Sequence, residues 1–469
     1  MNRVTEIKFN TITNTKNPSY RDEFVKGCWK WLKGRRADDN AEGLWRVKDK
    51  LYDLTDFIDR HPGGREWLIL AKGTDITESF EVFHLNSKPA QVLKKFYVRE
   101  AKEPRNYRLT FNEDGFFKTL RRRLIERLKT IDVNAYAWKS KLVFDLFVFC
   151  WIVFGMTSSI PSNWALKLLL AAISGIFATF LVNAGHNFIH QRNSWRMYGC
   201  HAALINFREF RVLHAMSHHM YPNSVYDLET LIYEPFFKYL PIAKTKMRIF
   251  LNYLSIPLIY ILGFHGAFLY RVIGLFQSDW KTDMQILYFD DIIGFLMPPL
   301  IFFTKIIYLT ITESSEEFSF YNLFLIAFEA GFLGNFILMS ASVTFSVIGL
   351  NVGHHGTDVT HEGDEFKSLD FGIYQLATTI DRTGANANLF MVLTHYGEHI
   401  IHHMIPSVDL AVLHLFWDIL EETCKEFEAE IKLIPIKKAA LLQFQQLKRI
   451  EYNKIEKDEN DNVVIKIQE

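Results

Sequence analysis

Apolar and polar positions divide this chain into regions of different character. Residues 1–102 mix polar and apolar positions, with frequent Gly, Pro and Asp, and residues 103–140 are rich in charge. Beyond them lie apolar runs at roughly 142–160 and 164–185, on either side of an uncharged, turn-like break at Pro161. A helix needs about 20 residues to cross the hydrocarbon core of a bilayer. The two runs therefore predict a tight transmembrane hairpin.

Three further apolar runs follow, at roughly 247–275, 286–310 and 321–350. The segment 190–250 carries many Arg and Lys residues, whereas the loop between the last two runs is acidic and has neither. The acidic residues of that loop are Glu313, Glu316 and Glu317. Because loops rich in Lys and Arg remain on the cytosolic side, we expect 190–250 in the cytosol and the acidic loop on the other side.

Histidine-rich segments stand before and after these three runs. If the two segments act together, an even number of crossings must separate them. We expect 286–310 and 321–350 to cross, and 247–275 to lie at the interface, because Arg248, His265 and Arg271 are unfavourable in lipid. The opposite assignment, in which 247–275 crosses and 286–310 does not, stays open. The residues that keep it open are Asp290, Asp291, Pro298 and Pro299.

The remaining pattern gives the domain organisation and the fold class. We expect a small α+β domain followed by an all-α integral membrane domain of about four transmembrane helices with a cytosolic helical cap. In the charged region, the spacing from Phe116 to Leu128 predicts an amphipathic helix. The expected divisions are an N-terminal extension (1–41), the α+β domain (42–102), a linker with the amphipathic helix (103–140), the membrane domain (141–430), and a polar tail (431–469) with a solvated helix and a disordered end.

Composition narrows the classes of function. The formal net charge is zero over 469 residues, which argues against a nucleic-acid-binding surface. The four cysteines are scattered without a CxxC pair, as expected in a reducing compartment. The first thirty residues carry charges and lack an apolar core segment, so we expect no cleavable secretory signal and a cytosolic N-terminus.

The 17 histidines are clustered, mostly between His186 and His219 or between His354 and His403. Several pairs have helical spacing, which places two imidazoles on one face of a helix. The clusters are His186 with His190; His214 with His218 and His219; His399 with His402 and His403; and Asn351 with His354 and His355. Imidazole is the commonest ligand of first-row transition metals. One metal cannot accept eight or nine imidazoles, so the pattern predicts two metal ions.

Residues 45–84 carry a second metal signal. His61-Pro62-Gly63-Gly64 is followed by Gly73-Thr74-Asp75-Ile76-Thr77, and His84 comes 23 residues after His61. Two neutral imidazoles on opposite faces of a haem leave no open position, so such an iron transfers electrons and does not bind oxygen. Because zinc has no redox chemistry, a haem domain on the same chain favours iron at the clustered histidines.

Residues 42–100 resemble cytochrome b5, on the strength of the HPGG and GTDIT elements and the spacing to His84. The resemblance implies that His61 and His84 are the axial ligands of haem b. It also implies an external NADH-dependent cytochrome b5 reductase as the source of electrons.

Residues 141–430 resemble the membrane fatty-acid desaturase and hydroxylase superfamily, whose boxes read HxxxH, HxxxHH and (H/Q)xxHH. The N-terminal position of the haem domain is that of the front-end desaturases. Four stretches are similar to the insect cytochrome b5-related proteins. These stretches are Arg36–Asp39, Ser217–Ser224, His361–Asp364 and Thr394–His403.

By this resemblance the iron-site residues are His186, His190, His214, His218, His219, His399, His402 and His403. His355 is the expected additional ligand, with His354 as the alternative, and Asn351 is expected to hold a water on one iron. The sequence departs from front-end desaturases at Asn187, where they usually have Asp, and at His399, where many have Gln. These departures put the usual position of the double bond in doubt.

The resemblance implies an O2-dependent acyl-lipid or acyl-CoA desaturase with two non-haem irons, in the endoplasmic reticulum membrane, with its haem domain and histidines facing the cytosol. Its partners would be a fatty acyl substrate, membrane lipids and the reductase. Three alternatives stay open: a fatty acyl or sphingolipid hydroxylase, a non-catalytic membrane-anchored electron carrier, and a zinc-binding membrane protein.

Overall fold

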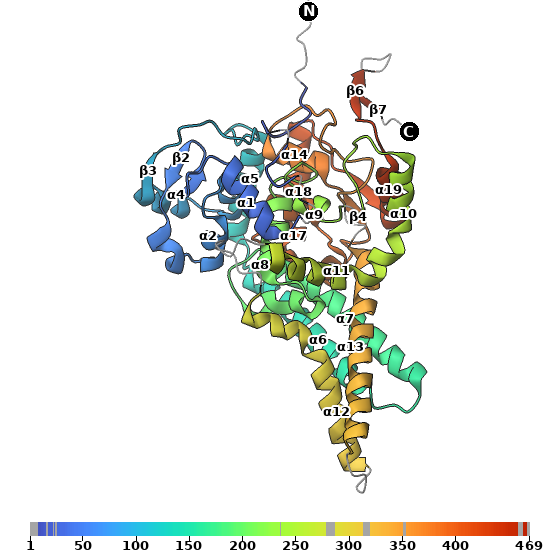
Figure 1. The fold of residues 1–469 in the computed structure, drawn as a ribbon. Coiled ribbons are helices and arrows are strands. Elements are labelled where there is room, and N and C mark those ends of the chain that lie inside the picture. The colour runs from blue at the N-terminus through green and yellow to red at the C-terminus, as the bar shows by residue number, and fades with distance from the viewer. Residues whose placement is uncertain are drawn as a thin grey trace, which may run out of the picture.

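Figure 1 shows a broad globular part above a narrower stem of long helices. This computed structural model describes residues 8–15, 17–21, 23, 26–234, 236–277, 287–312, 319–349, 353–457 and 463–466. Asn351 and the acidic loop with Glu313, Glu316 and Glu317 lie outside the described residues.

The N-terminal domain is α+β, as predicted. Its antiparallel sheet has the order β1-β2-β3, with Trp45 opposite Tyr52 and Leu51 opposite Arg99. The strands are β1 (Trp45–Val47), β2 (Lys50–Tyr52) and β3 (Tyr97–Glu100). The helices of this domain are η1 (Thr55–Arg60), α2 (Arg65–Ala71), α3 (Thr77–Phe83), α4 (Lys88–Leu93) and η2 (Lys94–Phe96). The two candidate haem ligands lie at the ends of η1 and α3.

The segment expected to be an N-terminal extension instead joins two domains. Its helix α1 (Cys28–Asp38) lies between the N-terminal α+β domain and the globular part of the second domain (Figure 1). The indole N–H of Trp31 donates to the Tyr226 carbonyl at 3.0 Å, and the Tyr20 hydroxyl donates to the Val225 carbonyl. Trp31 and Tyr20 are buried. The N-terminal α+β domain is therefore packed against the rest of the chain and not only tethered to it.

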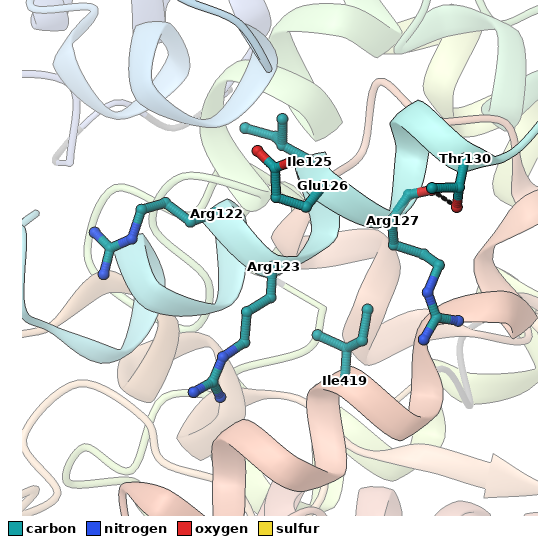
Figure 2. Close-up of a pocket in the computed structure, with 7 residues that line it drawn as sticks. All are labelled: Arg122, Arg123, Ile125, Glu126, Arg127, Thr130 and Ile419. Atoms are coloured by element: carbon teal, nitrogen blue, oxygen red, sulfur yellow. Dashed lines mark hydrogen bonds between the residues drawn. The ribbon is translucent and has the colours of Figure 1, made fainter.

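The predicted amphipathic helix is α5 (Phe116–Thr130), which buries Phe116, Leu120 and Leu124. Its basic side faces α18 (Trp417–Glu426): Arg127 donates to Asp418 at 2.7 Å, and Arg123 donates to the Thr423 hydroxyl at 2.8 Å. Figure 2 shows these two arginines reaching down on either side of Ile419. The charged linker thus packs on α18 of the second domain through its arginines and an apolar face.

The predicted hairpin is formed by α6 (Asn134–Thr157) and α7 (Trp164–Ile189), which lie in the stem with α12 (Met297–Thr312) and α13 (Phe320–Ile348) (Figure 1). Among the described residues, four helices are long and apolar enough to cross a membrane: α6, α7, α13 and Ile256–Phe276. η5 (Phe289–Phe295) and α12 form a fifth candidate only as a pair bent by 53°.

Helix α11 (Ile256–Gln277) has the length and composition of a span, although 247–275 was expected at the interface. Its contacts support the interfacial position. In α10 (Lys246–Leu254), which leads into it, the Tyr253 hydroxyl donates to the Phe444 carbonyl at 2.7 Å. Towards its other end, Arg271 pairs with Glu209 at 3.1 Å. Both ends thus meet the same globular layer, and Figure 1 shows α11 crossing the upper end of α13.

The globular part is made of short elements that surround the stem's upper end. Those between α7 and α10 are η3 (Trp195–Ala203), α8 (Phe207–Phe210), η4 (Arg211–His218) and α9 (Leu228–Leu231). Those after α13 are α14 (Phe371–Thr378), β4 (Asp381–Thr383), α15 (Leu389–His395), α16 (His399–Met404), α17 (Leu410–Leu413) and η6 (His414–Phe416).

The C-terminal region differs from the solvated tail that its polarity suggested. β5 (Leu433–Pro435) pairs in parallel with β4, and α19 (Ile436–Lys448) buries Leu442 and Leu447. Beyond the helix, the buried Arg449 donates to the buried Asp364 at 2.7 Å. The polarity of 431–469 as a whole predicts a solvated helix, but the apolar side of α19 faces the core. The strands β6 (Lys454–Lys457) and β7 (Val463–Lys466) close the described chain as an antiparallel pair.

Candidate metal and haem sites

Five buried histidines converge where α7 meets the globular layer. They are His186 and His190 of the end of α7, His214 and His219 of η4 and its cap, and His402 of α16. The Nε2 atom of His186 lies 2.6 Å from that of His214, 3.2 Å from that of His190 and 3.0 Å from that of His402. Metal–imidazole bonds are about 2.0–2.1 Å long, so such mutual distances suit nitrogens that share one ion.

A second group of four buried histidines lies beside the first. The Nε2 atom of His354 is 2.6 Å from that of His399 and 3.1 Å from that of His403. His218 completes the group, because a ligand atom of His218 lies within 4.8 Å of those of His354 and His403. The two groups touch through the stacked rings of His219 and His403, whose centroids are 4.0 Å apart.

The structure places His354, not His355, among the clustered histidines. The His354 ring contacts His218, with centroids 4.3 Å apart. His355 instead stacks on Tyr239, with centroids 4.2 Å apart and rings 14° from parallel. Burial lowers the pKa of His355 to about 4. Consecutive residues in the turn after α13 point in different directions, and only His354 faces the ligand groups.

A π-helix explains how three neighbouring histidines reach two groups. In η4 the backbone N–H of His219 donates to the carbonyl of His214 at 2.9 Å, a hydrogen bond between residues five apart. This wider turn, a rare element frequent at functional sites, brings the Nε2 atoms of His214 and His219 to 2.9 Å. His218 turns to the second group. The i, i+4 spacing that predicted a common face for His214 and His218 therefore describes this segment incompletely.

Outer hydrogen bonds fix the orientation of four of the rings. Nδ1–H of His214 donates to Glu229 at 2.6 Å, and that of His218 donates to Asp227 at 3.0 Å. The corresponding acceptors for His354 and His403 are the Thr378 carbonyl and the Gln375 side chain, each at 2.9 Å. A donor bond from Nδ1 leaves Nε2 as the metal-binding nitrogen. The sequence interpretation missed Asp227, Glu229 and Gln375; the acid pair nine and ten residues after His218 and His219 was the available signal.

The electrostatics of the pocket favour neutral imidazole, the form that binds metal. Burial, reinforced by neighbouring histidines, lowers the pKa of His219, His402 and His403 well below the usual histidine value. His218 is the exception: burial opposes its protonation, but Asp227 and Glu229 together outweigh burial and raise its pKa to about 9. The donor set is all nitrogen, buried and convergent, and it fits two first-row metal ions.

We expect Asp227→Asn to weaken the metal site. The buried Asp227 carboxylate accepts from His218, from the Asn223 backbone at 2.7 Å and from the Thr230 hydroxyl at 2.9 Å. An amide keeps the volume but removes the charge that holds the His218 ring, and such outer partners contribute about 10–100-fold to metal affinity. Competition with a graded series of chelators measures the change. Thr230→Val is the matched control, since it removes another bond to Asp227 and leaves His218 untouched; equal metal loss in both variants would contradict the assignment.

His61 and His84 face each other within the N-terminal α+β domain, with ring centroids 6.3 Å apart. Their Nδ1–H groups donate to the carbonyls of Gly64 and Phe80, each at 3.0 Å, so both Nε2 atoms are left to bind. Burial lowers the pKa of both rings. An iron bound between two Nε2 atoms at about 2.0–2.1 Å each suits this separation. Gly64 has φ +114°, a conformation that only glycine adopts readily.

Comparison with known proteins agrees with this geometry. Residues 162–434 match the fatty acid desaturase family, and residues 29–102 match the cytochrome b5-like heme/steroid binding domain. The chain therefore belongs to the fatty acid desaturase family, as a multi-pass membrane oxidoreductase with a fused cytochrome b5-like domain. The match from residue 29 includes α1 apart from Cys28, whereas the α+β domain was expected to begin at residue 42.

Two of the similar proteins match both halves of the chain. The chain is 37% identical over 450 residues to "Cytochrome b5-related protein" of Drosophila melanogaster, covering 94% of this chain and 95% of that protein. It is 26% identical over 442 residues to "Probable Delta(5) fatty acid desaturase C" of Dictyostelium discoideum, covering 88% and 93%. A 118-residue match to "Cytochrome b5-related protein" of Drosophila virilis is 53% identical and covers 25% of this chain and 82% of that protein. No solved structure matches the chain.

Proposed function

We propose that the chain is an O2-dependent fatty acyl desaturase whose two non-haem irons are held by the two histidine groups and supplied with electrons by its own haem b. The observation that carries the proposal is the convergence of nine buried imidazoles in two adjoining groups, beside a haem-like domain with two opposed histidines. Iron bound there would supply the activation of O2 that removal of hydrogen from an unactivated methylene requires.

The reaction balances as –CH2–CH2– + O2 + 2 e⁻ + 2 H⁺ → –CH=CH– + 2 H2O. His61 and His84 would hold the haem that supplies the two electrons singly, and an external NADH-dependent reductase would reload it. In the first group, His186 and His190 lie at the globular end of the apolar helix α7. An acyl chain that stays among apolar helices avoids a cost of about 0.8 kcal/mol per methylene exposed to water.

Two further assignments belong to the proposal. The front-end type is supported by the likeness to the Dictyostelium protein and to "Acyl-lipid (8-3)-desaturase" of Mortierella alpina, 26% identical over 276 residues. Location in the endoplasmic reticulum membrane rests on the family likeness, and a cytosolic position of both metal sites is supported by the excess of Arg and Lys in 190–250.

Product analysis tests this function. The purified chain in lipid nanodiscs, given NADH, cytochrome b5 reductase, O2 and a panel of saturated and unsaturated acyl lipids, is expected to form products with two fewer hydrogen atoms. Mass spectrometry of the extracted acyl chains measures them, with the His402→Ala chain as the blank. Products that carry an added oxygen in place of a double bond would establish the hydroxylase alternative, and haem turnover without any lipid product would establish an electron carrier.

A further inference from the structure

One aromatic side chain joins the haem site to the five-histidine group. Phe83, the last residue of α3, precedes the haem ligand His84 in the chain. Its ring lies almost parallel to that of His190, at 18° and with centroids 6.0 Å apart. Stacked rings at such separations are in favourable contact. One peptide unit and one ring contact therefore connect the two candidate metal sites.

The Phe83 ring is held in place by both domains. Within the haem domain it packs against Trp67, with centroids 5.2 Å apart. From the catalytic domain, the Ser407 hydroxyl donates to the Phe83 carbonyl at 3.2 Å. Arg121 of α5 donates to the next carbonyl, that of His84. The contact with His190 is thus part of a packed interface.

The other haem ligand belongs to a loop that packs against the same part of the catalytic domain. The Asn193 backbone N–H donates to the Gly63 carbonyl at 3.3 Å, and its side chain bonds Glu66 at 2.7 Å and Arg211 at 2.9 Å. A Cβ atom added to Gly64 would lie 2.5 Å from Asn193. Arg211 also covers the Trp67 ring, 4.5 Å from its centroid. The haem domain packs so closely against Asn193 that the methyl group of an alanine would not fit at Gly64.

We propose that the Phe83 ring couples the haem electronically to the metal bound by His190, an inference that rests on the proposed function. In each transfer one electron leaves the ferrous haem iron, which becomes ferric, and reaches a ferric non-haem iron, which becomes ferrous. Two transfers supply the two electrons of one desaturation. The ring itself is neither oxidised nor reduced. It places packed aromatic atoms between the haem ligand His84 and His190, so the electron does not have to cross an unfilled gap there.

Stopped-flow measurement of haem reoxidation tests the coupling. The holoenzyme, with its haem reduced anaerobically by reductase and limiting NADH, is mixed with O2 and an acyl substrate, and the haem absorption is followed. Phe83→Leu is expected to slow reoxidation about tenfold, equivalent to about 1.4 kcal/mol of activation free energy. Phe83→Tyr, which keeps the ring, should restore the rate. Haem midpoint potential, haem spectrum, non-haem iron content and the rate of haem reduction by the reductase should not change.

The controls separate the inference from the function beneath it. Reoxidation of the His402→Ala chain gives the direct reaction of haem with O2. If the unmodified protein is no faster than this variant, the proposed function fails. If the unmodified protein is faster than His402→Ala, but Phe83→Leu is as fast as the unmodified protein, the coupling role of Phe83 is wrong and the desaturase function stands. Should Phe83→Leu lose either cofactor, Phe83→Met supplies a non-aromatic, unbranched side chain that fills irregular gaps, and an unchanged rate in that variant overturns the inference.

Discussion

Alanine at His402 is expected to remove the metal of the five-histidine group and to lower desaturation by at least about 10³-fold, the scale seen when one member of an interdependent catalytic set is lost. His402 is buried, and its Nε2 atom lies 3.0 Å from that of His186. The haem should remain, because His61 and His84 belong to another domain. Iron content per chain, measured beside the haem spectrum, and product formation check both parts.

His395→Ala is the matched control for this variant. His395 lies in the same region of the chain, at the end of α15, but its ring bonds the Thr394 hydroxyl at 2.7 Å and belongs to neither histidine group. It should keep iron and most of the activity. A comparison of His354→Ala with His355→Ala then decides the additional ligand: only the first should lose iron. Full iron content in His402→Ala would contradict the grouping described above.

Replacement of Arg35 by leucine is expected to destabilise the seating of the haem domain by about 3–5 kcal/mol, the usual cost of removing one partner from a buried ion pair. Arg35 of α1 pairs with Asp39 at 2.7 Å and donates to the Asp75 carbonyl at 2.7 Å. Its guanidinium also lies over the rings of Tyr107 and Tyr221, 4.8 and 5.0 Å from their centroids. Leucine would leave the Asp39 carboxylate, which is fully buried, without its cation.

Asp39 is sensitive to this loss. Burial raises its pKa to about 7 even with Arg35 opposing the shift. Thermal unfolding followed by the haem absorption, and limited proteolysis between residues 100 and 116, measure the loosening. Arg99→Leu is the control, because Arg99 pairs with Glu42 at the surface of the same domain, and exposed pairs contribute at most about 1 kcal/mol. Equal stability of the two variants would contradict a structural role for α1.

Local signals in the sequence were sufficient for the larger features. The hairpin of α6 and α7 follows from the length of two apolar runs, and the haem-like domain follows from a short motif with a second histidine at a fixed distance. Both depend on interactions within a short segment. The helix α5 was predicted for the same reason, because its apolar face repeats at the helical period.

The finer features depend on long-range contacts and were missed. The choice between His354 and His355 turns on one residue of register after α13, and spacing alone does not determine it. The division of His214, His218 and His219 between two groups requires the π-helix, which has no distinct sequence signature. The packing of α19 depends on strand β4, which lies about fifty residues earlier in the chain.

The π-helix also has a consequence for how this segment tolerates change. A π-turn accommodates one residue more than an α-turn over the same rise, so η4 behaves as a helix with a one-residue insertion. If the same residues closed into regular α-helix, with 3.6 residues per turn, His219 would lie about 140° around the helix axis from His214. The two rings would then point apart although every histidine is retained. At this place the backbone geometry, as much as the identity of the residues, therefore specifies the site.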